Sequence, residues 1–174
     1  GDEAGLCGFT DPDNRRTYPW GREDQEMIAY HKAVIRMHRE NQEFKTGSIK
    51  CMVSQRNVIG YGRFTKENQS LILINNAEQE MTKELSVWEL GIPRESEMVQ
   101  LMLTCRDGFN ADPVKYQVRS GKIVVTLPPV SGIVLQYRSP FKGKHERSGR
   151  NEMLTMGSRE ENAGKERKNF LHFM

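Results

Sequence analysis

An acidic and a basic side chain four residues apart, Asp11 and Arg15, lie in the stretch DPDNRR near the start of the chain. A carboxylate accepts hydrogen bonds from hydroxyl groups, and a guanidinium donates several of them in a planar fork. The two side chains could therefore hold a hydroxyl-rich ligand, or they could form a local salt bridge with each other. The residues alone leave both interpretations open.

A second pair of acids, Asp2 and Glu3, precedes this stretch. Two carboxylates that flank a bond can act as general acid and general base. Neighbouring residues of a β-strand point to opposite faces, however, so on a strand these two could not flank the same bond. We therefore expect Asp2 and Glu3 to be structural.

Metal, redox and cofactor chemistry find little support in the sequence. His31 and His38 are seven residues apart and share a helix face, but no third ligand follows at a suitable spacing. Cys7, Cys51 and Cys105 form no CxxC motif, and such a sparse, odd set is typical of reduced thiols. The sequence predicts no metal site, no cofactor and a cytoplasmic rather than a secreted protein.

The elements that must position these residues begin with a loop and a helix. Glycines and prolines punctuate residues 1–21, which are predicted to be a loop. Arg22–Glu43 is predicted to be one helix, with acids early, basic residues late and a helical stripe of apolar side chains. Because such a stripe must be buried, this helix needs a partner surface.

Short strands follow the helix, separated by turn signals, and predict an antiparallel sandwich or barrel. Their spacing is roughly 8 to 12 residues, and RSGK at 119–122 is a tight hairpin signal. The expected strands are SIKCMVS (48–54), VIGYGRFT (58–65), SLILINN (70–76), KELSVWEL (83–90), VQLMLTC (99–105), KYQVRS (115–120), KIVVTLP (122–128) and SGIVLQYR (131–138).

Charge and composition change after Ser139. Residues 140–174 carry eight Lys and Arg against five acids, whereas residues 1–139 carry 18 of each. The tail is rich in charge, Gly, Ser and Asn and is predicted to be disordered. A neutral body argues against a nucleic-acid partner, and no apolar run approaches the roughly 18 residues of a membrane span.

Beyond these patterns, the stretch GDEAGLCGFTDPDNRRTYPWG, followed by a helix and a small β-domain, resembles the α-amylase family of glycoside hydrolases. There, the eighth strand of a TIM barrel ends in YGDE.G, a DP.NRR..PW loop follows, and an antiparallel C-terminal domain comes after the last helix. The resemblance is strongest to the neopullulanase, cyclomaltodextrinase and amylopullulanase branch. It covers residues 1–139 by architecture and about twenty residues by motif.

The resemblance implies a domain organisation. Residues 1–44 would be the end of a TIM barrel, with its last loop and last helix, and residues 45–139 a C-terminal β-sandwich. Residues 140–174 would be the polar tail. The family's three catalytic carboxylates follow barrel strands four, five and seven, so the resemblance implies that they lie upstream, that the N-terminus is missing, and that this chain holds no catalytic residue.

The resemblance also implies roles for single residues. Asp11 and Arg15 match the acid and the arginine that bind a glucose unit in this branch, and Pro12 would preset the turn between them. Arg16, Tyr18 and Trp20 would anchor the loop to the barrel. The strand aromatics Tyr61, Trp88, Tyr116 and Tyr137 are expected to pack in the core or an interface, with a starch-binding surface as the alternative.

The predicted function is that of the C-terminal part of a retaining glycoside hydrolase acting on α-glucans such as starch, pullulan, maltooligosaccharides or cyclodextrins. Its expected partners are an α-glucan oligosaccharide and the missing barrel portion, and the chain alone is expected to be inactive. The alternative is a non-catalytic β-sandwich module that binds carbohydrate or a partner protein. A nucleic-acid binder is a distant third, and no membrane partner is expected.

Overall fold

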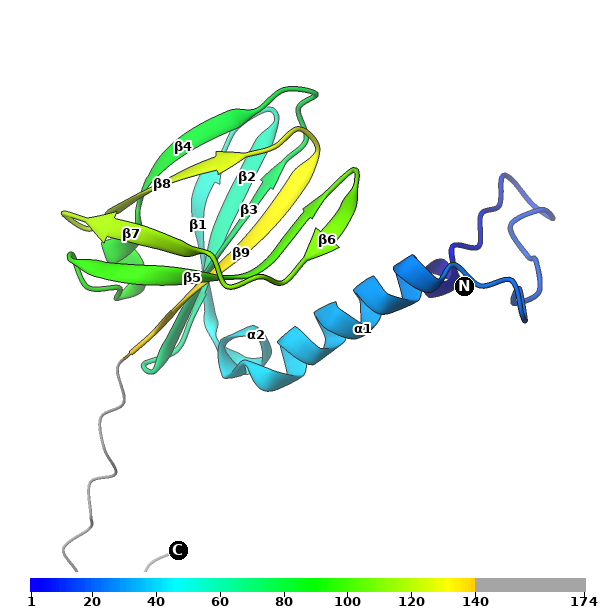
Figure 1. Ribbon diagram of the computed structural model, residues 1–174, viewed down its shortest axis with the longest axis horizontal. Helices are drawn as coiled ribbons and strands as arrows, with labels where there is room; N and C mark the ends of the chain where they lie inside the picture. The colour runs from blue at the N-terminus through cyan, green and yellow to red at the C-terminus, as the bar shows by residue number, and fades with distance from the viewer. Residues whose placement is uncertain (140–174) are drawn as a thin grey trace, which may run out of the picture. The chain divides into compact units, whose positions relative to one another are not determined.

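A computed structural model describes residues 1–139 (Figure 1), and the predicted tail at 140–174 lies outside these residues. Nine strands pair into one antiparallel sheet, so the predicted β-domain is confirmed. The strands are β1 (Ser48–Ser54), β2 (Val58–Phe64), β3 (Asn68–Asn75), β4 (Met81–Ser86), β5 (Ser96–Cys105), β6 (Gly108–Asn110), β7 (Lys115–Arg119), β8 (Lys122–Leu127) and β9 (Ser131–Arg138).

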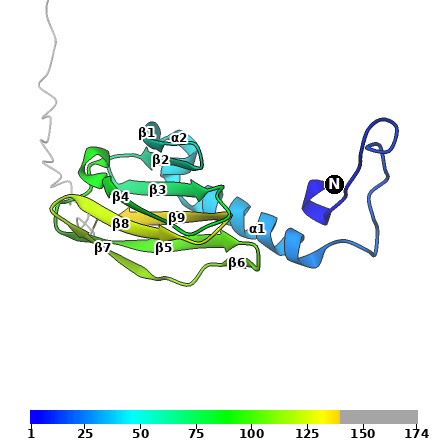
Figure 2. The same cartoon turned by 90° about the horizontal axis from the view of Figure 1, so that it is seen from above.

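The sheet curls over on itself. Its strands are hydrogen-bonded in the order β1-β2-β3-β9-β5-β7-β8-β4, and β6 pairs with β5 beside this path. The two ends of the path meet, because Nζ of Lys83 in β4 donates to Oε1 of Gln55, just after β1, at 2.7 Å. Seen from above, β1 and β2 lie at one side of the domain and β5, β6 and β7 at the other (Figure 2).

Alternating side chains fill the space inside the curled sheet. On β8, Ile123, Val125 and Leu127 are completely buried, whereas the residues between them are exposed. Leu71 and Leu73 of β3 are equally buried, and they belong to the same cluster. These side chains thus point into a shared core, and on β8 they do so with the period of two that is typical of a strand. The buried cluster consists of Val58, Leu71, Leu73, Leu85, Val87, Leu90, Ile92, Met98, Val118, Ile123, Val125, Leu127, Ile133 and Leu135.

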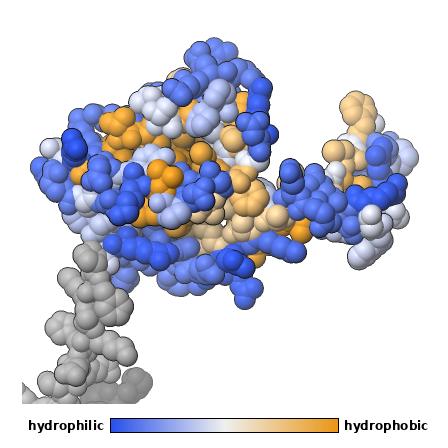
Figure 3. All heavy atoms as spheres, viewed as in Figure 1, coloured by the Kyte–Doolittle hydropathy of each residue, from blue (hydrophilic) through white to orange (hydrophobic). Residues whose placement is uncertain are grey.

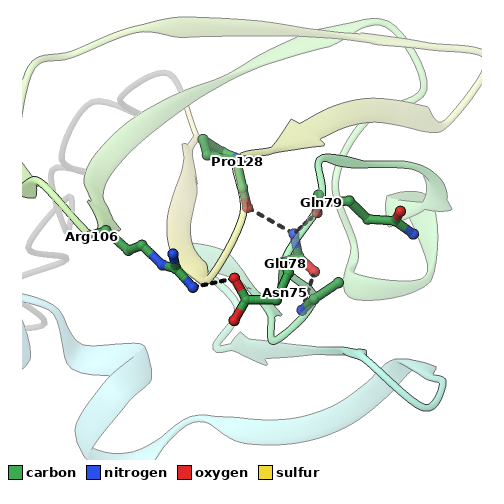
Figure 4. A network of polar contacts seen from close by, with 6 residues as sticks. Asn75, Glu78, Gln79, Arg106 and Pro128 are labelled. Atoms are coloured by element: carbon green, nitrogen blue, oxygen red, sulfur yellow. Dashed lines mark hydrogen bonds and ion pairs between the residues drawn. The ribbon is translucent and has the colours of Figure 1, made fainter.

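Polar contacts tie three loops of the sheet together (Figure 4). At the end of β3, Nδ2 of Asn75 donates to the carbonyl of Gln79 at 2.9 Å and to that of Pro128 at 2.7 Å. Glu78 forms an ion pair with Arg106, which follows β5. These contacts link the β3–β4 loop to the β8–β9 and β5–β6 connections.

Helix α1 (Gln25–Glu40) precedes the sheet and starts at a capped end. The carboxylate of Asp24 accepts a hydrogen bond from the backbone N–H of Met27 at 3.0 Å, which satisfies one of the free donors of the first turn. Tyr30 of α1 lies edge-on to Phe109 of β6, with ring centroids 5.5 Å apart. No residue of α1 is fully buried, so this contact leaves much of the helix uncovered.

The prediction of one helix over 22–43 is wrong at its end, because α1 stops at Glu40. The chain becomes extended at Asn41, whose Nδ2 donates to the carbonyl of Met37 at 2.7 Å and so caps the end of α1. A separate short helix, α2 (Gln42–Thr46), follows. Within residues 1–139, no helix combines the length and apolar character needed to cross a membrane.

The expected strand at 83–90 is also only half correct. Strand β4 ends at Ser86, and Val87–Leu90 form a 3-10 turn, η2. Gly91 ends this turn in the left-handed conformation, with φ 85°, which glycine adopts without strain. Trp88 therefore lies in a turn rather than on a strand.

The predicted hairpin at 119–122 is confirmed. Arg119 of β7 pairs with Lys122 of β8, and the two residues between them, Ser120 and Gly121, have φ values of 51° and 77°. Positive φ at both central residues is the mark of the turn whose twist matches that of the flanking strands. The short strand β6, by contrast, lies within a segment expected to be only a turn.

Candidate functional site

The predicted site residues lie in a loop that begins and ends at one place. The backbone N–H of Asp24 donates to the carbonyl of Ala4 at 3.1 Å, so the residues between them leave and return to the same point. Ala4 is buried, with 3% of its surface exposed. The loop is thus anchored at its base and open to solvent along its length.

Asp2 and Glu3 lie at this base. They belong to a 3-10 turn, η1 (Asp2–Ala4), and not to the end of a β-strand as expected. A hydrogen bond from its own backbone N–H lowers the pKa of Glu3 below the usual value. Glu3 is therefore ionised near neutral pH, where it cannot donate a proton as a general acid.

Asp11 and Arg15 are brought together by the structure. Nε of Arg15 donates to Oδ1 of Asp11 at 3.3 Å, and Nη2 donates to Oδ2 at 3.4 Å. Both side chains remain more than half exposed, at 62% for Asp11 and 77% for Arg15. The local ion pair is therefore present, and both groups are still open to a ligand. Contact with sugar stays a prediction.

Arg16 pairs with a different acid. Its Nε and Nη2 donate to Oδ1 of Asp13 at 2.9 and 2.5 Å, and the backbone N–H of Phe9 donates to Oδ2 at 2.9 Å. The guanidinium and then the Phe9 N–H hold the pKa of Asp13 below its ordinary value. Asp13 thus connects the first half of the loop to the Arg16 side chain.

Aromatic side chains on the loop are conspicuously uncovered. Tyr18 and Trp20 contact each other, with ring centroids 4.6 Å apart, yet 81% of Trp20 and 87% of Phe9 are exposed. Figure 3 shows apolar surface at the loop as well as over the strands. Large apolar groups that remain this exposed mark a surface suited to contact with another surface.

A buried polar cluster that the sequence analysis missed joins α2 to the sheet. Glu43 is completely buried, and its Oε1 accepts hydrogen bonds from Oγ of Ser70 at 2.7 Å and Nε2 of Gln136 at 2.5 Å. Gln136 also donates to Oδ1 of Asn41 at 2.8 Å. The predicted domain boundary at 44/45 therefore falls inside a helix that is bonded to the β-domain.

The histidines and cysteines do not converge on a site. Nδ1 of His31 lies 2.9 Å from the carbonyl of Met27, one turn back on the same helix, and His38 is exposed. In residues 1–139 no three or more His, Cys, Asp or Glu side chains could together hold a metal ion. All three cysteines are free thiols.

The strand aromatics differ in their surroundings. Tyr116 and Tyr137 pack against the core cluster, as expected, and burial raises the pKa of Tyr116. Tyr61 is half-buried. Trp88 is instead 50% exposed, and the guanidinium of Arg94 lies 5.9 Å from its ring centroid.

The fold matches solved structures of one enzyme class. An α-amylase from Geobacillus thermoleovorans, solved with acarbose, aligns with a TM-score of 0.67 and 20% identity over 81% of this chain and 29% of its own. The debranching enzyme of Nostoc punctiforme aligns with a TM-score of 0.61 and 26% identity over 79% and 27%. The described residues therefore have the fold of a C-terminal region of α-amylase-family enzymes.

Sequence comparison points to the same enzymes. The amylopullulanase of Thermoanaerobacter thermohydrosulfuricus is 32% identical over 146 residues, which are 78% of this chain and 9% of that protein. Neopullulanase 2 of Thermoactinomyces vulgaris is 26% identical over 139 residues, 78% of this chain and 22% of that protein. No family model matches the chain. The chain is thus homologous to part of the α-amylase-family enzymes in the branch that its motifs predicted, and it spans only a small share of their length.

Proposed function

We propose that this chain is the C-terminal part of a retaining glycoside hydrolase that acts on α-glucans. The observation that carries the proposal is the relation to an amylopullulanase over 78% of this chain but only 9% of that protein. The catalytic carboxylates belong to the part of such an enzyme that has no counterpart here. This chain contributes a sugar-binding loop and an accessory β-domain, and alone it hydrolyses nothing.

Asp11 and Arg15 are suited to hold one glucose unit at the edge of the active site. The carboxylate accepts from sugar hydroxyls and the guanidinium donates to their oxygens, so the pair complements two neighbouring hydroxyl groups. Because the two side chains already contact each other, less conformational freedom is lost when the sugar binds. The loop thereby positions the substrate and transfers no proton.

The uncovered apolar side chains suit a second surface of the same enzyme. Ile35 and Met27 of α1 are 55% and 37% exposed, and Phe9 and Trp20 of the loop are more exposed still. A helix with an uncovered apolar stripe gains stability when another element covers it. The barrel portion of the enzyme is the proposed partner.

A chimera tests the proposal directly. This chain replaces the 146 matching residues of the Thermoanaerobacter thermohydrosulfuricus amylopullulanase. We expect the chimera to hydrolyse maltooligosaccharides, and Asp11→Ala or Arg15→Ala to lower kcat/KM about tenfold to hundredfold, as expected for losing charged hydrogen bonds of about 1.5–3 kcal/mol. Glu67→Ala, at an exposed acid in the β2–β3 turn, is the matched control and should change nothing.

Two results would contradict the proposal. One is a chimera whose activity is the same with and without Asp11 and Arg15. The other is hydrolysis of maltoheptaose by the chain alone that survives Glu3→Ala and Asp11→Ala together, because the catalytic groups would then lie in this chain.

The alternative function, a non-catalytic binding module, rests on the complete core of the β-domain. A domain whose apolar side chains are buried within itself needs no barrel to fold. An inactive chimera, combined with saturable binding of maltoheptaose or of a partner protein by the chain alone, would favour this alternative.

A further inference from the structure

Three polar side chains form a row across three neighbouring strands of the sheet. Arg63 of β2 pairs with Ser70 of β3, and Ser70 pairs with Gln136 of β9, so the three side chains lie next to one another. They point away from the core, because their chain neighbours Leu71 and Leu135 point into it. Ser70 and Gln136 are nevertheless 0% and 2% exposed. A polar row that is buried on the outer face of a sheet indicates that another element is bound to it.

Helix α2, which lies between α1 and the sheet (Figure 1), is that element. Oε1 of Glu43, near the start of α2, accepts hydrogen bonds from two members of the polar row. Nη2 of the third member, Arg63, donates to the carbonyls of Phe44 and Gly47 at 3.2 and 3.1 Å. Because α2 has only five residues, bonds at both of its ends fix its position on the sheet.

The polar row also reaches the end of α1, through Asn41. Nε2 of Gln136 donates to Oδ1 of Asn41 at 2.8 Å. Nδ2 of the same Asn41 side chain donates to the carbonyl of Met37, in the last turn of α1, at 2.7 Å. Asn41 is 6% exposed, so water competes little for these bonds. A side chain of β9 is thus connected to α1 through a single residue.

Apolar packing between α1 and the sheet is incomplete. Tyr30 contacts Phe109, but no residue of α1 is fully buried. A cavity of about 350 Å³ separates Val34 and Met37 of the helix from strand residues such as Ile72. A helix that is not closely packed along its length can change direction without opening a core. The hydrogen bonds of the polar row are therefore the main restraint on the direction of α1.

We propose that the polar row of Arg63, Ser70 and Gln136 positions the sugar-binding loop, and that it acts through α2 and α1. Helix α1 has 16 residues, so it is about 24 Å long, and a turn of about 10° at its end would move its start by about 4 Å. The loop is anchored at that start, next to Asp24. Displacing a substrate-positioning group by about 1 Å can cost about a hundredfold in rate. The role of the loop rests on the proposed function, whereas the hold on α1 rests on the hydrogen bonds alone.

A distance within the chain tests the hold on α1. Ala29→Cys, at an exposed residue of α1, is combined with Cys7→Ser and Cys105→Ser, which leaves spin labels at position 29 and at the exposed Cys51 of β1. Double electron–electron resonance should give one narrow distance distribution for this chain. Gln136→Ala, which removes the bond to α1's capping residue and one bond to α2, should shift or broaden that distribution.

Two further variants separate position from stability. Glu43→Gln keeps an acceptor at Oε1 and should leave the distance distribution narrow. Val125→Ala opens a cavity in the core and should lower the unfolding temperature without changing the distribution below that temperature. A distribution that is unchanged in Gln136→Ala, or that broadens equally in Val125→Ala, would overturn the inference.

Kinetics of the chimera test the connection to the loop. Gln136→Ala there should raise KM for maltooligosaccharides about threefold to tenfold and change kcat less, because the loop binds substrate and transfers no proton. Val125→Ala should change neither constant below the unfolding temperature. An active chimera whose KM is the same with and without Gln136→Ala would overturn the inference for the loop. An inactive chimera, combined with a label distance that still responds to Gln136→Ala, would refute the proposed function and leave the hold on α1 standing.

Discussion

The loop before α1 and the β-domain after it are stabilised in different ways. The β-domain buries Leu71, Ile123 and Leu135 completely in a core of its own. The loop leaves Phe9 and Trp20 more than four-fifths exposed and is shaped by exposed ion pairs between side chains close in sequence. Burial contributes far more free energy than such exposed pairs. The β-domain is therefore held mainly by its own core, whereas the loop is held mainly by contacts between residues close in sequence.

The largest expected effect on stability comes from a substitution in the core of the β-domain. Leu71→Ala should lower the free energy of unfolding by about 2–5 kcal/mol, because it opens a cavity in a site with no exposed surface. Urea denaturation followed by far-ultraviolet circular dichroism measures this change.

The loop supplies the control for that prediction. Trp20→Ala removes a larger side chain, but from a position that is 81% exposed, and should change the free energy of unfolding by less than about 0.5 kcal/mol. Comparable losses of unfolding free energy for Leu71→Ala and Trp20→Ala would show that the loop and the sheet share one core. The loop and the β-domain would then not be stabilised in different ways.

A smaller effect is expected at the junction of the two regions. Glu43→Ala leaves the Ser70 hydroxyl without its buried acceptor and removes one of the two acceptors of the Gln136 amide, which should cost about 1–3 kcal/mol. Glu43→Gln keeps an acceptor of the same length and should cost less. Thermal unfolding measures both, with the exposed neighbour Glu40→Ala as control.

This pair of variants also shows where the β-domain begins. If Glu43→Gln costs as much as Glu43→Ala, the hydrogen bonds to Oε1 are not what holds α2. If neither variant changes the unfolding temperature, α2 belongs energetically with α1 rather than with the sheet.

The smallest expected effect is on the loss of stability at low pH. The ammonium of Lys115, 2.9 Å from Oε1, lowers the pKa of Glu97 below its usual 4.5. Because this pKa is lower in the folded state, the stabilisation is complete above about pH 4.5 and is lost as the pH falls through the depressed value. Thermal melts between pH 6 and 3 should therefore fall less steeply for Lys115→Met.

Asp13 is the counterpart in the loop, since the guanidinium of Arg16 also depresses its pKa. Arg16→Met should leave the pH dependence of the β-domain's melting unchanged, because the loop does not share its core. An Arg16→Met profile that matches that of Lys115→Met would refute the separation of the two regions.

Much of the strand pattern was predictable, because alternation and turn chemistry are local. The segments expected at 48–54 and 131–138 coincide with β1 and β9, and Ser120–Gly121 forms the expected turn. The break at Asn41 and the turn at Trp88 were missed. In both cases a cap or a left-handed glycine interrupts a periodicity that otherwise continues.

The candidate site also has one part that the local sequence predicted and one part that it did not. The proximity of Asp11 and Arg15 follows from their spacing in a short turn, and the motif around them predicted the enzyme family to which the chain is related. The burial of Glu43 depends on Ser70 and Gln136, which are 27 and 93 residues away. No local pattern distinguishes this acid from the exposed acids of the neighbouring helix.

The sequence by itself thus determined most of the strands, the hairpin and the loop, because each depends on side chains within a few residues of one another. Only the tertiary structure decided that the sheet curls until β4 meets β1, that Glu43 of α2 is buried against the sheet, and that Trp88 is half exposed under the guanidinium of Arg94. These features arise from contacts between distant segments. Burial and exposure are set by what the whole fold brings together.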